Sequence, residues 1–156
     1  MKKIFMIATL CMMAMATCFA QDSATVQAKV NAIVKKFEKT KGVECTTVGK
    51  GSGLGLVKMI LSAESGSDFT KGVTKIIIIE YSEASQATCD ALHQEFDGFK
   101  SILDDLSGAD DKKEYSYFAS YGKVNADDKS MSDFIIITED KDAKMFMYMV
   151  GKIKVE

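Results

Sequence analysis

The chain has 156 residues, of which 47% are hydrophobic, so it is long enough to fold as one domain with a sizeable core. It carries 20 basic and 22 acidic residues, for a formal net charge of −2, and every basic residue is a lysine. A nucleic-acid partner is therefore not expected, because the charge has the wrong sign and arginine, which grips phosphate with two hydrogen bonds, is absent.

Residues 1–20 are predicted to be a secretory signal peptide. Lys2 and Lys3 form a positive start, an uncharged apolar stretch follows, and small residues stand where a signal peptidase requires them before Gln21. The stretch is shorter than the about 20 apolar residues of a permanent membrane helix. Cleavage after Ala20 would leave a single domain over residues 21–156. The alternative is a lipoprotein signal with an acylated Cys18, which would attach the domain to a membrane.

The mature chain is expected to begin with an amphipathic helix over residues 23–39, where apolar side chains recur every three or four positions. Gly42 ends this helix. A short strand over 43–49 and a second helix over 54–63 follow, joined by a glycine-rich turn. The turn matches neither the dinucleotide nor the Walker pattern, so no nucleotide site is predicted there.

The central strand is predicted over residues 73–81. Four consecutive isoleucines, Ile76 to Ile79, place β-branched side chains on both of its faces. Both faces therefore need apolar cover, from the first helix, a second subunit or a partner. The longest helix is expected next, over residues 84–106, with an apolar stripe on one side.

Three strands are predicted to close the chain, over residues 114–124, 131–139 and 143–155, with polar turns between them. The resulting order, α-β-α-β-α-β-β-β, indicates an α+β fold. We expect a two-layer α/β sandwich with right-handed strand–helix–strand crossovers. Its mixed sheet would end in an antiparallel three-strand meander. The absence of proline and of repeats favours one domain.

Removal of the leader would leave two cysteines, Cys45 and Cys89. An oxidising compartment could pair them, but a disulfide needs the two Cα atoms within about 7 Å, which a sequence does not show. A single disulfide and two half-buried free thiols both remain open.

One helical flank carries a thiol, an imidazole and a carboxylate. His93 is the only histidine of the chain, with Cys89 four residues before it and Asp97 four after. This order resembles a nucleophile, a base and an orienting acid, and makes a thiol-dependent enzyme an alternative function. On a helical wheel, however, the row drifts from the core edge into solvent, so no catalytic residue is predicted.

Met145, Met147 and Met149 alternate along the last strand and align three thioethers on one face. Such a row suits Cu(I), so a copper carrier is a second alternative, but core packing explains the thioethers equally well. No cofactor and no metal site are predicted. The acidic pairs lack the spacing of a calcium loop; they are Asp104-Asp105, Asp110-Asp111 and Asp127-Asp128.

Tyr115, Tyr117 and Tyr121 share one face of the first meander strand. A half-exposed tyrosine row offers large contact area at little entropic cost, which makes it the candidate surface for a partner. Cross-strand aromatic packing is the alternative explanation.

Three segments carry a resemblance to a known family: residues 37–43 leading into the first strand, the isoleucine-rich central strand, and the closing meander from Phe134–Ile137 to Met145–Gly151. Together with the element order, they make the chain similar to the small exported proteins of Bacteroidota known as domain of unknown function 4252. The resemblance covers nearly the whole mature chain. It implies a place in the cell envelope and a link to envelope signalling, and it brings no catalytic residue.

We therefore expect a non-enzymatic, exported protein of the periplasm or outer membrane. It would bind a protein or peptide partner in the envelope, or a second copy of itself, through its sheet. Contact with a membrane is expected only if Cys18 is lipidated.

Overall fold

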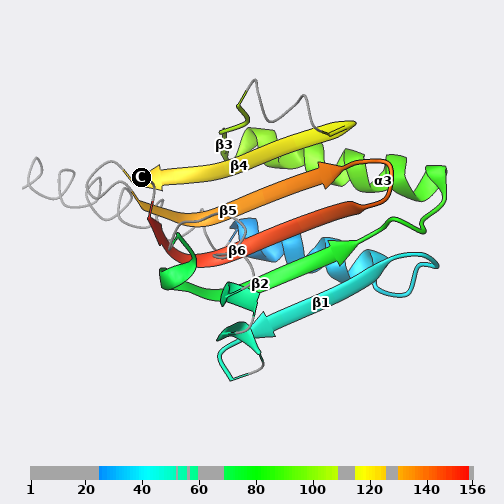
Figure 1. Cartoon of the computed structure of the whole chain (residues 1–156). Helices are drawn as coiled ribbons and strands as arrows, with labels where there is room; N and C mark the ends of the chain where they lie inside the picture. The colour runs from blue at the N-terminus through cyan, green and yellow to red at the C-terminus, as the bar shows by residue number, and fades with distance from the viewer. Residues whose placement is uncertain are drawn as a thin grey trace, which may run out of the picture.

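The computed structural model describes residues 25–51, 53–55, 57–59, 69–108, 115–125 and 130–154. The predicted signal peptide and Cys18 lie outside these ranges. In the described part of the chain, six strands form one sheet in the order β1-β2-β6-β5-β4-β3 (Figure 1). The strands are β1 (Glu44–Gly49), β2 (Val73–Glu80), β3 (Asp104–Asp105), β4 (Tyr117–Asn125), β5 (Ser130–Glu139) and β6 (Lys144–Lys154).

The helical segments are residues 25–37, residues 54–55 and 57–59, the 3-10 turns η1 (Phe69–Gly72) and η2 (Gly98–Ser101), and α3 (Gln86–Asp97). Together with the sheet they confirm the α+β class. None of the described helices is long and apolar enough to cross a membrane.

The longest predicted helix, residues 84–106, is shorter in the structure. Its start is as expected, because Ser85 caps α3 by accepting a hydrogen bond from the backbone N–H of Thr88. After Asp97 the chain tightens into η2 and then forms the short strand β3.

The expected mixed sheet is wrong, because every strand pairing is antiparallel. The strands β1 and β2 pair directly and antiparallel, so the expected crossover between them is wrong. The segment that includes α3 does cross from β2 to β3, which run in the same direction. The meander β4–β6 fills the space between these two strands, so no parallel pair forms.

The 25–37 helix and α3 lie on the same face of the sheet, behind it in Figure 1. They pass each other in opposite directions. Lys36 forms an ion pair with Glu95 at 2.6 Å, and the ammonium of Lys29 lies 5.3 Å from the centre of the Phe99 ring. The core beneath them includes Val30, Ile33 and Phe37 from the first helix, Leu92 and Phe96 from α3, and Ile77, Ile79, Ile135, Ile137 and Phe146 from the sheet.

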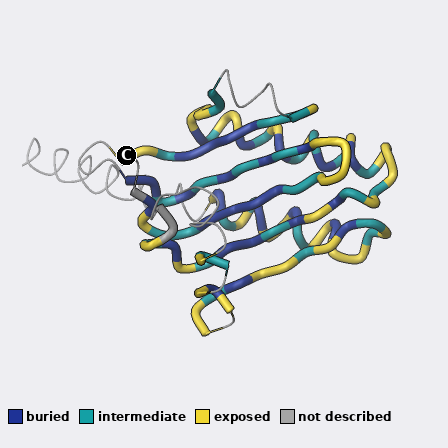
Figure 2. Tube along the Cα trace, viewed as in Figure 1, coloured by how far each residue is buried: buried dark blue, intermediate teal, exposed yellow. Residues whose placement is uncertain are grey.

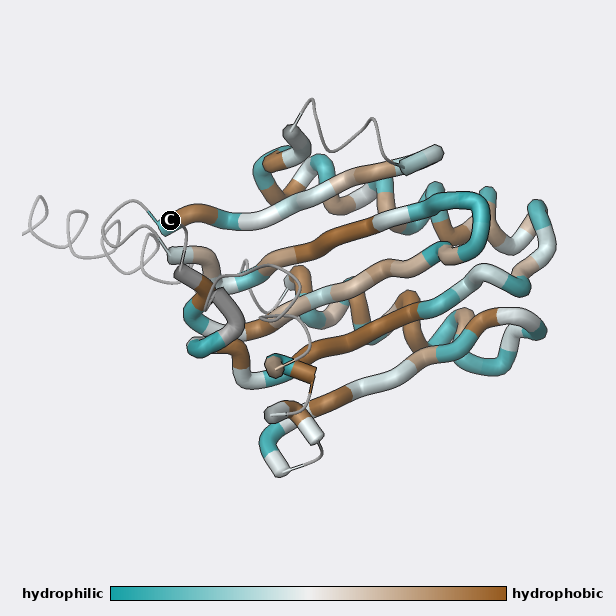
Figure 3. The backbone as a smooth tube through the Cα atoms, viewed as in Figure 1, coloured by the Kyte–Doolittle hydropathy of each residue, from teal (hydrophilic) through white to brown (hydrophobic). Residues whose placement is uncertain are grey.

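The opposite face of the sheet is also apolar, and we call it the methionine face. It comprises Ile76, Ile78, Phe134, Ile136, Met145, Met147 and Met149, against which Leu54 and Val57 pack. Ile76, Met147 and Met149 are buried, whereas Ile78, Phe134, Ile136 and Met145 are half-buried. The central isoleucines thus meet apolar side chains on both faces, as predicted. Figures 2 and 3 colour the middle of β2 as buried and hydrophobic.

The turn between β5 and β6 has the predicted position. The Asp140 carboxylate accepts hydrogen bonds from the backbone N–H groups of Asp142 and Ala143, both at 2.7 Å. The turn before β5, expected at Asn125–Asp128, lies outside the described residues after Asn125.

The loops before β1 and after β2 contact each other closely at Gly42. This residue has φ +81°, in the left-handed region, and a Cβ at this position would lie 2.3 Å from the carbonyl oxygen of Glu83. Only glycine satisfies both requirements. Gly42 therefore holds the start of β1 against the end of β2.

Gly42→Ala is expected to lower the free energy of unfolding by more than about 2 kcal/mol. A left-handed alanine alone costs about 1–2 kcal/mol, and the collision with Glu83 adds to it. Gly53→Ala is the matched control, because Gly53 has φ +80° but nothing within 4 Å of the added carbon. Urea denaturation measures the free energy of unfolding of both variants. An equal loss of stability in the two would contradict the close contact between Gly42 and Glu83.

Candidate functional site

A group of polar side chains closes the helix-covered core at one end, and we call it the Glu139 cluster. Four residues lie side by side across the sheet: Tyr81 directly after β2, Lys144 on β6, Glu139 on β5 and Tyr117 on β4. The strand registers and the hydrogen bond from the Tyr81 N–H to the Lys144 carbonyl show this order. The side chains of Cys89 and His93, both on α3, contact this row.

The carboxylate of Glu139 is the centre of the cluster. Its Oε1 accepts a hydrogen bond from the Tyr81 hydroxyl at 2.8 Å and another from His93 Nε2 at 2.5 Å. Glu139 is buried, and a buried carboxylate is costly unless charged or polar donors satisfy it. Tyr81 and His93 supply those donors, so the cluster is stable as it stands.

The pKa of Tyr81 is raised well above its usual value. Burial is the main cause, followed by the hydrogen bond to Glu139 and by its negative charge. The same arrangement recurs on β5 at Asp133, which is buried and accepts a hydrogen bond from Tyr148 at 2.5 Å. Burial and Asp133 likewise raise the pKa of Tyr148. A tyrosine thus satisfies the buried carboxylate near each end of β5.

Cys45 and Cys89 are both free, which decides between the two alternatives left open by the sequence. Cys89 is only 1% exposed; its thiol lies 3.9 Å from the Ala84 carbonyl oxygen and accepts a hydrogen bond from the Lys144 ammonium at 3.5 Å. Cys45 is half-buried, and burial together with the nearby charge of Glu38 raises its pKa. The Cys89 thiol is therefore enclosed, and the raised pKa of Cys45 disfavours its thiolate.

The predicted drift of the Cys89–His93–Asp97 row into solvent is confirmed. The side chain of His93 is 29% exposed and that of Asp97 is 56% exposed, and Asp97 pairs with Lys100 at 2.5 Å. The carboxylate that holds His93 is instead Glu139, 46 residues further along the chain. Sequence reasoning missed it, although Glu139 stands in phase with the buried isoleucines of β5, which is an informative position for an acidic residue.

The tyrosine row is not exposed as one surface. Tyr121 is 1% exposed in the helix-covered core, where burial raises its pKa to about 12. Tyr117 is half-buried and stacks on His93 with ring centres 5.0 Å apart. Tyr115 precedes β4 and stacks on Phe118. The expectation of a half-exposed row is therefore corrected, and partner binding by the parts of Tyr115 and Tyr117 that are exposed stays a prediction.

The methionine row lies on the methionine face, where Met147 and Met149 are buried among apolar side chains. Packing therefore accounts for these two thioethers. In the described ranges, no group of three or more His, Cys, Asp or Glu residues is arranged to hold a metal ion.

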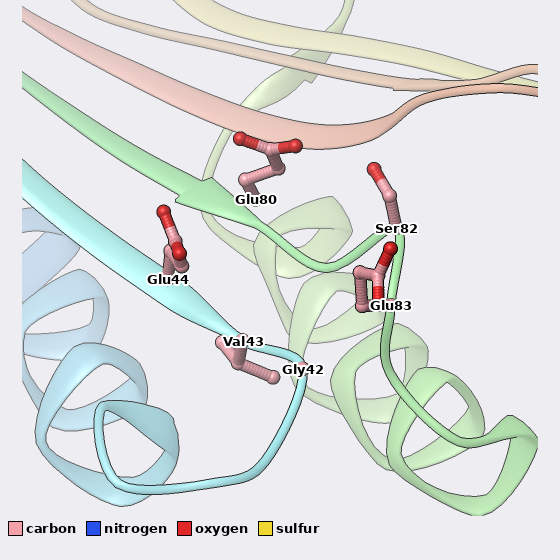
Figure 4. A pocket seen from close by; sticks show the side chains of 6 residues that line it. All are labelled: Gly42, Val43, Glu44, Glu80, Ser82 and Glu83. Atoms are coloured by element: carbon pink, nitrogen blue, oxygen red, sulfur yellow. The ribbon is translucent and has the colours of Figure 1, made fainter.

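A cavity of about 510 Å³ lies where β1 begins and β2 ends. Figure 4 shows that three carboxylates surround it, from Glu44 on β1, Glu80 on β2 and Glu83 in the following loop. Gly42, Val43 and Ser82 complete the lining. The cavity and the Glu139 cluster are made of different residues.

The acidic lining carries an electrostatic cost. Glu44 and Glu80 are directly opposite each other in the register of β1 and β2, and like charges in such a pair are destabilising. Within the described residues, none of the three glutamates forms an ion pair or a side-chain hydrogen bond. This corner of the sheet is therefore complementary to a positive charge.

Comparison with known proteins found no relative. No family model matches the chain, and neither curated proteins nor solved structures gave a match. The resemblance to domain of unknown function 4252 stays a prediction from the sequence.

The free energy of unfolding is expected to fall as the pH rises above about 10. Unfolded tyrosines ionise near pH 10, whereas Tyr81, Tyr121 and Tyr148 keep their protons in the folded protein because their pKa values are raised. Above pH 10 the folded state binds more protons than the unfolded state, so the stability present at lower pH is lost. The slope is about 1.4 kcal/mol per pH unit for each such tyrosine.

Urea denaturation between about pH 8 and pH 11 measures this slope. Tyr148→Phe removes one titrating group. It is expected to reduce the slope of the free energy of unfolding against pH by the contribution of one tyrosine, whatever it does to the stability at neutral pH. A free energy of unfolding that stays constant across this range would contradict the assignment.

Proposed function

We propose that the protein is a non-enzymatic binding module of the cell envelope, and that the methionine face contacts a protein or peptide partner. The observation that carries the proposal is the half-buried set Ile78, Phe134, Ile136 and Met145. In a two-layer arrangement the 25–37 helix and α3 occupy one face of the sheet, and the other face is covered only in part by Leu54 and Val57 among the described residues.

The apolar area that stays exposed at this face is available to a partner. Full burial of a large apolar side chain contributes about 1.5–3 kcal/mol. The four half-buried side chains keep at most roughly a third of their area exposed, so together they retain at most on the order of 4 kcal/mol for a partner to gain. Apolar, flexible methionine side chains also adapt well to an incoming surface.

The Glu139 cluster supports a structural role in place of catalysis. The Glu139 carboxylate accepts bonds from Tyr81 and His93, and the Cys89 thiol is enclosed. The side chains that line the cavity include neither Cys89 nor His93. A catalytic centre needs a reactive group that a substrate can reach, and the thiol of this cluster is enclosed.

Export and envelope location rest on the charged start, apolar core and small residues of the leader. The same features place the protein in an environment where the methionine face would meet envelope proteins. A link to envelope signalling follows only from the family resemblance.

A photo-cross-linking amino acid at position 136 is expected to give a covalent adduct with a partner in cells that export the protein. The matched control is position 32, an exposed alanine on the 25–37 helix, which faces away from the sheet. Adducts should form at 136 and not at 32, and Ile78→Lys should abolish them because it places a charge on the same face, separated from Ile136 only by Met147. No adduct at 136, or equal adducts at both positions, would contradict the proposal.

Mass spectrometry of the same purified protein tests the export part. An N-terminus at Gln21 indicates signal-peptide cleavage, and an acylated Cys18 indicates membrane attachment. A chain that retains Met1 and Lys2 would contradict export.

A further inference from the structure

Among the described strands, β1 is an edge of the sheet with no neighbour along its outer side. In the described part of the chain it pairs with β2 alone, so alternate N–H and C=O groups of β1 point away from the sheet. Glu44, Thr46 and Thr47 are exposed, and Figure 2 shows the strand largely in the exposed colour. Such an edge is a template for another strand.

The opposite edge of the sheet is covered. There the two-residue strand β3 pairs with β4, and the chain continues alongside it, because the Leu106 N–H donates to the Ser120 carbonyl and Ser107 Oγ accepts from the Ser120 N–H. The edge at β1 has no such cover among the described segments.

The strand β1 also lacks most devices that prevent edge pairing. The chain has no proline, and the register of β1 against β2 runs without a bulge from Glu44 to Gly49. The β-branched residues Thr46, Thr47 and Val48 favour a strand neighbour. The remaining device is a charge, Glu44, which stands at the very start of the strand.

A second copy of β1 would place a positive charge opposite Glu44. When two β1 strands pair antiparallel about a two-fold axis normal to the sheet, residues of the same face must oppose each other. In one such register, Thr47 lies opposite Thr47 of the other copy. Thr46 of each copy then lies opposite Val48 of the other. At the ends of the same ladder, Glu44 lies opposite Lys50, which is exposed in the turn after β1.

We propose that the protein forms a symmetric dimer through its β1 strands, with Lys50 of each copy beside the acidic cavity of the other. Two six-stranded sheets thereby join into one continuous sheet. Each Lys50 ammonium offsets the repulsion between Glu44 and Glu80, which nothing in the described residues of one copy relieves. This interface is separate from the methionine face and does not depend on a partner there.

Charge reversal at the two ends of the ladder tests the dimer. Glu44→Lys and Lys50→Glu each place like charges opposite one another, and each is expected to raise the dimer dissociation constant by at least about tenfold. The double variant Glu44→Lys/Lys50→Glu restores opposite charges and is expected to return the constant to within about threefold of the original protein. Sedimentation equilibrium with a reductant, which prevents linkage through Cys45, measures all four proteins.

The centre of the ladder gives a second, independent test. Thr47→Lys brings two ammonium groups together at the two-fold axis and is expected to abolish the dimer, whereas Thr47→Val is expected to keep it. Because Thr47 is exposed, neither change should alter the circular dichroism spectrum. A protein that is monomeric at all concentrations, or a dimer that is indifferent to these charges, overturns the proposal.

Discussion

The antiparallel pairing of β2 with β6 is the interaction on which the rest of the structure depends. It joins the β1–β2 pair to the meander of β3, β4, β5 and β6, and among the described strands no other pair connects these two parts of the sheet. Both strands carry apolar side chains on both faces, as Ile76 to Ile79 and Met145 to Val150 show. A strand of this kind is stable only in the interior of a sheet with cover on either side.

That central pairing makes the register of the neighbouring strands important, and the buried polar groups help to set it. The hydrogen bond from Tyr81 to Glu139 links the end of β2 to the end of β5, with β6 between them. The bond from Tyr148 to Asp133 links β6 to β5 at the other end. A slip of one residue would turn each carboxylate to the opposite face and leave its tyrosine unpaired, so both pairs oppose such a slip.

The strands were well predicted because their signal is local. The β-branched and aromatic runs at Val73–Glu80, Ser130–Glu139 and Lys144–Lys154 appear in the structure within one or two residues of the expected positions. The direction of the strands was not predictable in the same way, since it depends on which end of the sheet each connection returns to. The sequence of the helix that follows β2 does not show whether the strand after that helix pairs with β2 or lies at the far edge of the sheet.

The candidate sites show the same limit. Alternation correctly puts Tyr117 and Tyr121 on one face of β4, but it does not say that the helices lie over that face, so the row looked available to a partner. The contact between His93 and Glu139 depends on how α3 lies over β5. Spacing along one helix pointed to Asp97, whereas packing of two distant elements brought Glu139 to the histidine.

The distribution of unsatisfied groups separates the stabilising part of the molecule from its binding surfaces. In the described residues, every buried side-chain nitrogen and oxygen has a hydrogen-bond partner, including the carboxylates of Asp133 and Glu139. Among the described residues, the side chains of Glu44, Glu80 and Glu83 around the cavity form no ion pair or side-chain hydrogen bond, and the outer side of β1 has no neighbouring strand. A second molecule gains free energy of binding only where polar groups still lack a hydrogen-bond or ionic partner, or where apolar area is still exposed to water. Association is therefore favoured at the β1 edge and the methionine face, while the helix-covered side supplies the rigidity that both surfaces need.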